Sequence, residues 1–128
     1  MLRVPYIFSL GLTLASLLVS LGCSSYPQVA PKVDQEKALQ VLRTALDAWK
    51  EGKPITDLAQ ASDKIVAQDF DWMQNKKLIS YEVMGSGIPQ DANLRVEVSL
   101  RFDGDAQPKK VAYIVGTAPA QTVFRAFE

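Results

Sequence analysis

The chain of 128 residues carries 14 basic and 14 acidic side chains, and it contains no histidine and one cysteine. A chain of this length suits one domain, and its balanced charge lacks the basic surface that nucleic-acid binding requires. Without histidine or a second cysteine, the sequence excludes Ser-His-Asp and Cys-His nucleophiles, the usual zinc sites and an intrachain disulfide, and it indicates no cofactor.

The N-terminal segment, residues 1–22, has the order of a secretory signal. One basic residue, Arg3, precedes an almost wholly apolar run over residues 6–21, and small residues lie near its end. We therefore expect this segment to be removed on export. The alternative is a retained membrane anchor, because residues 4–21 come within the range of about 17 to 25 residues that spans a bilayer.

The end of this segment carries the most specific motif of the chain. The four residues Ser20-Leu21-Gly22-Cys23 resemble the lipobox of bacterial lipoproteins. In that family the cysteine receives a diacylglyceryl group and becomes the first residue after cleavage. The resemblance implies that Cys23 is lipidated and that this lipid attaches the protein to a membrane. Ser24 is not the aspartate associated with inner-membrane retention, which points to the outer membrane.

Ordinary secretory cleavage at the same position remains an alternative, because Ser20 and Gly22 also fit the small-x-small rule. It would yield a secreted soluble protein whose free thiol has no partner in an oxidising compartment, and this favours the lipid. Residues 23–33 then form a lipidated tether, since Pro27 and Pro31 favour extended backbone. The ten residues 24–33 let the domain stand at most about 35 Å from the bilayer.

Residues 34–128 are expected to form a single folded domain that begins with an amphipathic helix. Asp34 is suited to be its N-cap, and apolar residues recur at helical spacing from Ala38 to Trp49. Gly52, followed by a proline, should end this helix after roughly 17 residues. Its broad apolar stripe must be buried against another element.

Three short elements are predicted next, namely a helix at residues 57–61, a strand at 64–67 and a single helical turn within 68–77. Either Asp69 or Asp71 can cap the turn, and a loose hairpin connection is the alternative for this stretch.

The C-terminal part alternates apolar and polar residues, as half-buried strands do. Strands are expected at residues 78–84, 94–102, 110–117 and 122–127, and the glycine-containing segment 85–93 is expected to be a flexible loop. Short polar connections between successive strands imply an antiparallel meander.

These elements predict an α+β fold in which the N-terminal helix packs on a curved antiparallel meander sheet of four to five strands. Their order is similar to that of the cystatin-like and NTF2-like architectures, a similarity that rests on no diagnostic motif. Such folds host enzymes, binding modules and inert domains, so the similarity does not fix an activity. It does imply that any pocket would lie between helix and sheet.

Asp69 and Asp71 are the candidate catalytic residues, because paired carboxylates perform acid-base chemistry or hold a hard cation. The alternative role is that of caps and solvated turn residues, which is favoured because no further acidic ligand follows at calcium-loop spacing. Tyr81 or Tyr113 would accompany them in an NTF2-like cavity. Trp49, Trp72, Tyr81, Tyr113 and Phe124 could line such a cavity but are expected in the core.

The strands also predict a polar outer face of mixed charge, formed by Ser80, Glu82, Arg95, Glu97, Ser99 and Arg101. Such a face is either simply solvated or binds a partner. The sequence as a whole predicts a lipid-anchored cell-envelope protein that is not an enzyme and acts as a small interaction or structural module. A ligand-binding or catalytic NTF2-like domain is the alternative.

Overall fold

The computed structural model describes residues 32–127, so the predicted signal segment, Cys23 and most of the tether lie outside the described residues. The described part is an α+β fold, as predicted. In chain order its elements are α1 (Gln35–Lys50), α2 (Asp57–Gln60), β1 (Val66–Gln68), α3 (Phe70–Met73), β2 (Leu78–Gln90), β3 (Asn93–Phe102), β4 (Lys109–Gly116) and β5 (Thr122–Arg125).

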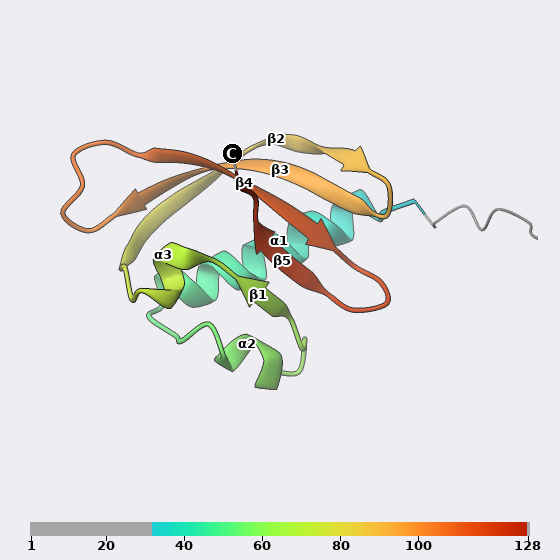
Figure 1. The fold of residues 1–128 in the computed structure, drawn as a ribbon, viewed down its shortest axis with the longest axis horizontal. Helices are drawn as coiled ribbons and strands as arrows, with labels where there is room; N and C mark the ends of the chain where they lie inside the picture. The colour runs from blue at the N-terminus through green and yellow to red at the C-terminus, as the bar shows by residue number, and fades with distance from the viewer. Residues whose placement is uncertain (1–31, 128) are drawn as a thin grey trace, which may run out of the picture.

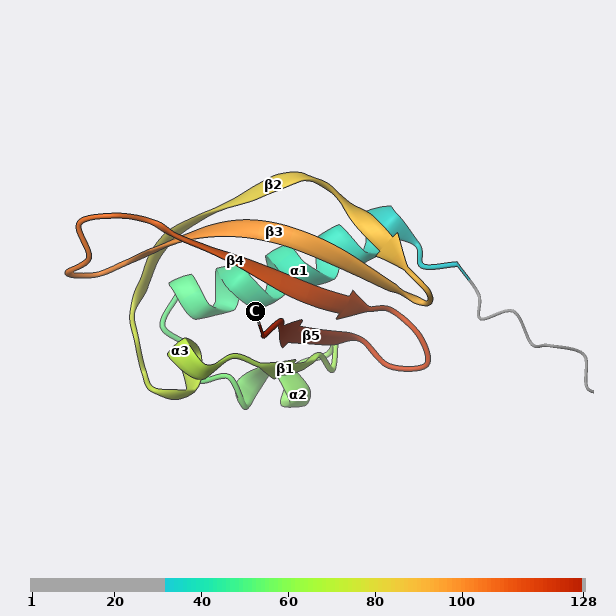
Figure 2. The ribbon, with the colours of Figure 1, turned by 45° about the horizontal axis from the view of Figure 1, so that its top comes forward.

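The five strands form one sheet in the order β1-β5-β4-β3-β2. Strands β2 to β5 are the predicted antiparallel meander, and α1 lies along one face of it (Figures 1 and 2). Strand β1 departs from the meander because it pairs in parallel with β5. Parallel neighbours need a long connection, and here α3 and the three strands β2 to β4 supply it.

Helix α1 follows from its sequence. The Asp34 side chain caps it by accepting a hydrogen bond from the backbone N–H of Lys37 at 3.0 Å, as predicted. The helix ends at Lys50, close to Gly52, whose positive φ of 82° suits glycine. Its buried stripe consists of Ala38, Val41, Leu42, Ala45, Leu46, Ala48 and Trp49.

This stripe packs on the inward face of the sheet. The inward side chains of β3 alternate along the strand and are fully or almost fully buried, namely Leu94, Val96, Val98, Leu100 and Phe102. Tyr113 and Val115 of β4 and Val123 of β5 extend the same cluster. The space between α1 and the sheet is therefore filled by packed side chains.

Strand β2 corrects one prediction, because it continues through the expected loop at residues 85–93 as far as Gln90. The register against β3 shifts there, so the Gly-Ser-Gly sequence forms a bulge within the strand. Gly85 and Gly87 have φ of 76° and 83°, which glycine adopts without strain. Gln35 of α1 donates its amide to backbone carbonyls of the bulge, which fixes the bulge against the helix.

Other boundaries differ by a few residues. The short strand is shifted toward the C-terminus and starts at Val66, because Lys64 takes a left-handed φ of 48° that interrupts extended backbone. The last strand ends at Arg125, short of the predicted residue 127. The helical turn predicted within 68–77 is α3.

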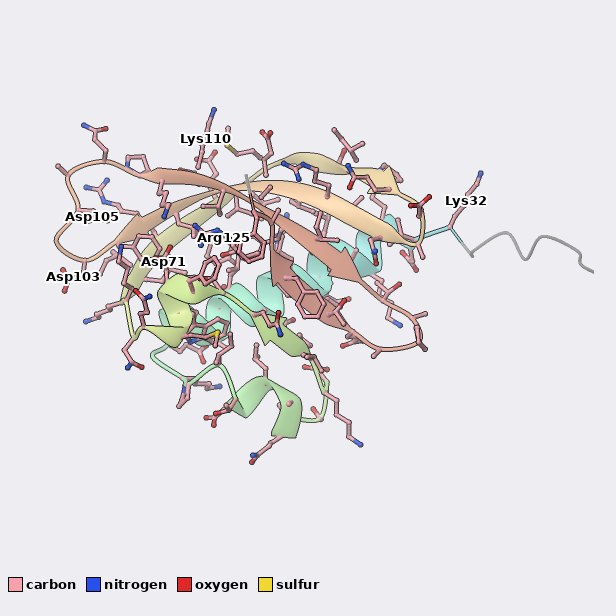
Figure 3. The ribbon with its side chains drawn as sticks, in the orientation of Figure 1. Lys32, Asp71, Asp103, Asp105, Lys110 and Arg125 are labelled. Atoms are coloured by element: carbon pink, nitrogen blue, oxygen red, sulfur yellow. The ribbon has the colours of Figure 1, made fainter. Side chains whose placement is uncertain are left out.

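The start and the end of α1 mark two opposite ends of the domain. Lys32 and the beginning of α1 lie at one end, beside the turn between β2 and β3 (Figures 1 and 3). The end of α1, α3 and the connection between β3 and β4 lie at the opposite end. At about 1.5 Å per residue, the 16 residues of α1 separate the two ends by about 24 Å.

Candidate functional site

A buried polar cluster joins α3 to two strands that come much later in the sequence. It consists of Asp69 and Asp71 at the start of α3, Tyr113 of β4 and Arg125 of β5, and we call it the aspartate cluster. Asp69 is 3% and Asp71 is 8% exposed, and they are the two buried polar or charged residues of the described chain. Figure 3 shows Asp71 and Arg125 close together. The two aspartates are therefore not solvated turn residues, which corrects the simpler prediction.

The Asp69 carboxylate is saturated with hydrogen bonds. Its Oδ1 accepts from the backbone N–H groups of Asp71 at 2.9 Å and Trp72 at 3.2 Å, so Asp69 rather than Asp71 caps α3. Its Oδ2 accepts from the Tyr113 hydroxyl at 2.5 Å. Nη1 of Arg125 lies 3.2 Å from both oxygens. Each of these contacts stabilises a negative charge that burial alone would disfavour.

Asp71 is surrounded by cations. Its Oδ2 accepts from Nη1 of Arg125 at 3.1 Å, and the ammonium groups of Lys109 and Lys76 lie 3.4 and 3.7 Å from its carboxylate oxygens. Burial by itself would raise the pKa of Asp71. The hydrogen bond from Arg125 and the positive charges of Lys109, Arg125 and Lys76 together outweigh burial and hold this pKa below its ordinary value.

The other two members are also held in one protonation state. Burial, the negative charge of Asp69 and the hydrogen bond to it raise the pKa of Tyr113 far above its ordinary value. Burial opposes the charge on Arg125, but the negative charge of Asp69, the Tyr113 hydroxyl and the hydrogen bonds to both aspartates together outweigh burial and raise the pKa of Arg125. An efficient general acid or base needs a pKa near the working pH. The pKa values of Asp71, Tyr113 and Arg125 all move away from neutrality, which suits a structural clamp better than proton transfer.

Tyr81, the third candidate, lies apart from the aspartates. Its hydroxyl donates to Oδ1 of Asp47 on α1 at 2.6 Å. Burial first, and then the hydrogen bond to Asp47 and its negative charge, raise the pKa of Tyr81. Tyr113 occupies the position beside Asp69, so of the two tyrosines considered from the sequence only Tyr113 joins the cluster.

Arg125 is the member that sequence reasoning missed. It lies two residues after the buried Val123, and alternate residues of a strand share a face. A charged residue at an inward position needs a buried partner. This alternation is the signal that would have singled out Arg125, although it does not identify Asp69 as the partner.

A surface pocket of about 230 Å³ adjoins the aspartate cluster. It lies beside α3 and the C-terminal residues rather than between α1 and the sheet, where the similarity to NTF2-like folds would place it. The rings of Phe70 and Phe127 both line it and meet edge to face, with centroids 5.0 Å apart. The lining residues are Gln68, Asp69, Phe70, Met73, Arg125 and Phe127.

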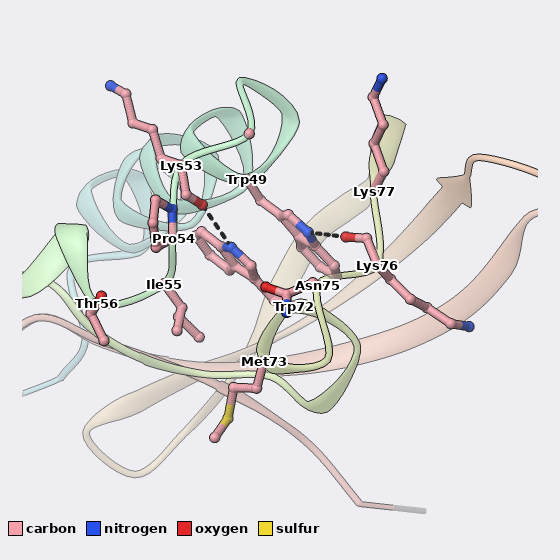
Figure 4. Close-up of a pocket in the computed structure, with 11 residues that line it drawn as sticks. Trp49, Lys53, Pro54, Ile55, Thr56, Trp72, Met73, Asn75, Lys76 and Lys77 are labelled. Atoms are coloured by element: carbon pink, nitrogen blue, oxygen red, sulfur yellow. Dashed lines mark hydrogen bonds between the residues drawn. The ribbon is translucent and has the colours of Figure 1, made fainter.

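A second pocket, of about 290 Å³, lies where α1 ends (Figure 4). The rings of Trp49 and Trp72 are among its lining and stack in parallel, with centroids 5.2 Å apart and planes 2° apart. Their indole N–H groups donate to the backbone carbonyls of Lys76 at 2.8 Å and Lys53 at 2.9 Å. The stack and these hydrogen bonds therefore tie α1, α3 and the segments that follow these two helices together. We call this cavity the Trp pocket.

The aromatic candidates differ in how far they are buried. Trp49, Trp72 and Tyr113 are buried, as expected for core residues, and Tyr81 is partly buried. Phe124 lies on the outer face, because its neighbour Val123 is the core residue of that strand and adjacent side chains point to opposite faces.

Two further features of residues 32–127 bear on the site. No group of three or more potential ligands among their acidic, histidine and cysteine side chains is arranged to hold a metal ion. None of the helices in this part of the chain has the length and apolar character needed to cross a membrane.

Comparison of the chain with protein-family models, with curated proteins and with solved structures finds no match. The candidate sites are accordingly interpreted from their own geometry.

Proposed function

We propose that this chain is a lipid-anchored protein of the cell envelope whose folded domain serves as a small interaction or structural module without enzymatic activity. The proposal rests first on the sequence of residues 1–23, in which Arg3, an apolar run and the lipobox-like Ser20-Leu21-Gly22-Cys23 follow in order. Cleavage before Cys23 would leave a diacylglyceryl cysteine at the N-terminus. Two acyl chains give stable anchorage where one gives only marginal binding.

One observation supports the non-enzymatic part of the proposal. The buried polar groups of the described domain meet in the aspartate cluster, where Asp69 accepts hydrogen bonds from Tyr113, Arg125 and the α3 backbone. Both oxygens of its carboxylate therefore already accept hydrogen bonds from other groups of the protein. With the pKa values of its partners held away from neutrality, the cluster is better suited to fixing α3 against the sheet than to chemistry.

The position of Lys32 supports a role in binding. Lys32 lies at the opposite end of the domain from α3 and the Trp pocket (Figure 3). A domain anchored through Cys23 would be held by the end that carries Lys32. Its far end, about 24 Å away along α1, would then be free to contact other molecules of the envelope.

Replacing the acceptor thiol tests the anchor. We expect the Cys23→Ala variant, expressed in a bacterial host that processes lipoproteins, to lose incorporation of radiolabelled palmitate and to leave the outer-membrane fraction. The neighbouring Ser24→Ala substitution is the matched control and should still be labelled. Equal labelling of the Cys23→Ala and wild-type chains, or no labelling of either, would contradict the proposal.

A ligand-binding or catalytic NTF2-like domain remains the second candidate, because Asp69 and Asp71 are buried and Asp69 borders a pocket of about 230 Å³. This candidate predicts a small molecule that stabilises the wild-type protein against heat but not the Phe70→Ala variant, in which the half-exposed ring at the pocket mouth is removed. A thermal-shift screen distinguishes the candidates, since the interaction module predicts no such ligand.

A further inference from the structure

The Trp pocket offers exposed apolar side chains to solvent, namely Pro54 and Met73, with the partly buried Ile55 beside them. The stacked rings of Trp49 and Trp72 also line it, but they are only 3% and 5% exposed and mainly give the pocket a rigid wall. Met73 is 61% exposed, which is high for so apolar a side chain. An exposed methionine beside aromatic rings is typical of adaptable binding surfaces, because its flexible chain fits apolar groups of different shape.

The rim of this pocket is basic. Lys53, Lys76 and Lys77 all line it, and Lys53 and Lys77 extend outward on either side of the tryptophan pair (Figure 4). Two of these lysines have acidic partners, since Lys53 lies 3.1 Å from Glu51 and Lys76 lies 3.7 Å from Asp71.

Lys77 is exposed and makes no ion pair with any residue of the described chain 32–127. The pair between Lys53 and Glu51 is exposed on both sides and can be exchanged at little cost in free energy. The pocket therefore offers positive charge to a ligand.

Asn75 adds hydrogen-bonding capacity at the same rim. It lines the pocket, is exposed and has a left-handed φ of 62°, a conformation that asparagine tolerates. Its side-chain amide carries both a donor and an acceptor. A peptide backbone presents the complementary pair, a C=O and an N–H, to such a group.

We propose that the Trp pocket binds a short segment of a partner protein in which an apolar side chain lies next to an acidic one. The apolar side chain contacts Met73 and Pro54, and the carboxylate pairs with Lys77 at the rim. A volume of about 290 Å³ accommodates one or two side chains rather than a folded domain. The inference rests on the proposed function, because it identifies the partner chemistry of that interaction module.

Selection from a random library tests this inference. The full-length chain, solubilised in detergent and immobilised, is exposed to phage that display random 12-residue peptides. We expect the enriched peptides to combine an aspartate or glutamate with a neighbouring aromatic or aliphatic residue. Failure to enrich any peptide, or enrichment of peptides without an acidic residue, would overturn the inference.

Variants then locate the binding site of the enriched peptides. Lys77→Glu reverses the charge at the rim and Met73→Ser removes the apolar contact. Each should raise the dissociation constant by about tenfold or more. Fluorescence anisotropy of labelled peptide measures this constant. Both residues are exposed, so these variants should fold normally.

Matched controls carry the same chemical changes elsewhere. Lys37→Glu lies on α1 near the end that carries Lys32, and Met84→Ser lies on β2. We expect both to bind within about twofold of the wild-type chain. Equal weakening by the controls, or no weakening by Lys77→Glu and Met73→Ser, would place the site elsewhere. If the chain binds such peptides but proves not to be lipidated, the inference about the Trp pocket stands and only the proposed lipid anchor is rejected.

Discussion

Asp69 connects three elements through a single carboxylate, since it caps α3 and accepts hydrogen bonds from Tyr113 of β4 and Arg125 of β5. Its ion pair with Arg125 is almost completely removed from solvent. Breaking a buried pair by removing one partner leaves the other charge uncompensated, and the resulting loss of stability is large. The residue that the sequence offered as a catalytic candidate is therefore expected to be important for folding.

Replacing Asp69 by alanine tests this role. We expect Asp69→Ala to lower the free energy of unfolding by about 3 to 5 kcal/mol, because Arg125 and the Tyr113 hydroxyl lose their buried acceptor. Urea denaturation followed by tryptophan fluorescence measures the change. Asp105→Ala removes an exposed carboxylate and should change stability by no more than about 0.5 kcal/mol. Similar values for the two variants would show that the aspartate cluster contributes little.

The lowered pKa of Asp71 predicts a pH dependence. Because its pKa is lower in the folded than in the unfolded chain, Asp71 stabilises the fold at pH values above its ordinary pKa of 3.8. This contribution is lost as the pH falls through the lowered pKa of the folded state. The wild-type chain should therefore be more stable than Asp71→Asn near pH 7, and the difference should shrink as the pH falls toward about 2.

Urea denaturation of both chains at a series of pH values measures this difference. Comparison with Asp71→Asn isolates one group, since the other carboxylates titrate in both chains. A stability difference that stays constant or grows between about pH 5 and pH 2 would contradict the assigned charge state of Asp71.

The contacts of Asp69 could be predicted from the sequence only in part. The cap role of an aspartate in residues 68–77 was predictable because capping is local. The partners of Asp69 are 44 and 56 residues away in the chain, and nothing in the local pattern identifies them. Tyr81 and Tyr113 both fit a strand pattern, and only the fold decides that Tyr113 lies beside Asp69.

At the scale of elements, local patterns predicted α1 and β3 well because each has a buried face of regular period. Two features were missed for different reasons. The parallel pairing of β1 with β5 joins residues more than fifty positions apart, which periodicity cannot reveal. The continuation of β2 to Gln90 was hidden by its glycines, which usually mark loops but here form a bulge within the strand.

The two glycines of that bulge predict different responses to substitution. Gly85 and Gly87 both have positive φ, so alanine is strained at either position. A Cβ atom at Gly85 would meet open space, whereas one at Gly87 would lie 2.7 Å from Cγ of the fully buried Leu94. We expect Gly85→Ala to destabilise the protein by about 1 kcal/mol and Gly87→Ala by about 2 to 3 kcal/mol.

Chemical denaturation of the two variants side by side measures the difference, and Gly85→Ala serves as the control for backbone strain. Equal destabilisation would mean that Leu94 moves aside without cost. It would also show that the packing of the bulge against β3 is less tight than the distances indicate.

At the scale of the whole molecule, the domain has two ends with different properties. Lys32, to which the tether leads, lies at one end, and the Trp pocket with its basic rim lies at the other. If Cys23 carries the lipid, this arrangement directs the Trp pocket away from the bilayer. The aspartate cluster and the stacked tryptophans hold α3 against the rest of the domain, so that the end that carries the Trp pocket keeps its shape.

The intact mass of the protein purified from membranes of its native host tests the central claim most directly. We expect a species that starts at Cys23 and is heavier than the polypeptide by a diacylglyceryl group, with or without an amide-linked acyl chain. An unmodified chain starting at Cys23 would instead be a secreted soluble domain with a free thiol. The full chain of 128 residues would be a membrane-anchored protein that keeps its N-terminal segment, and either mass would contradict the proposed lipoprotein.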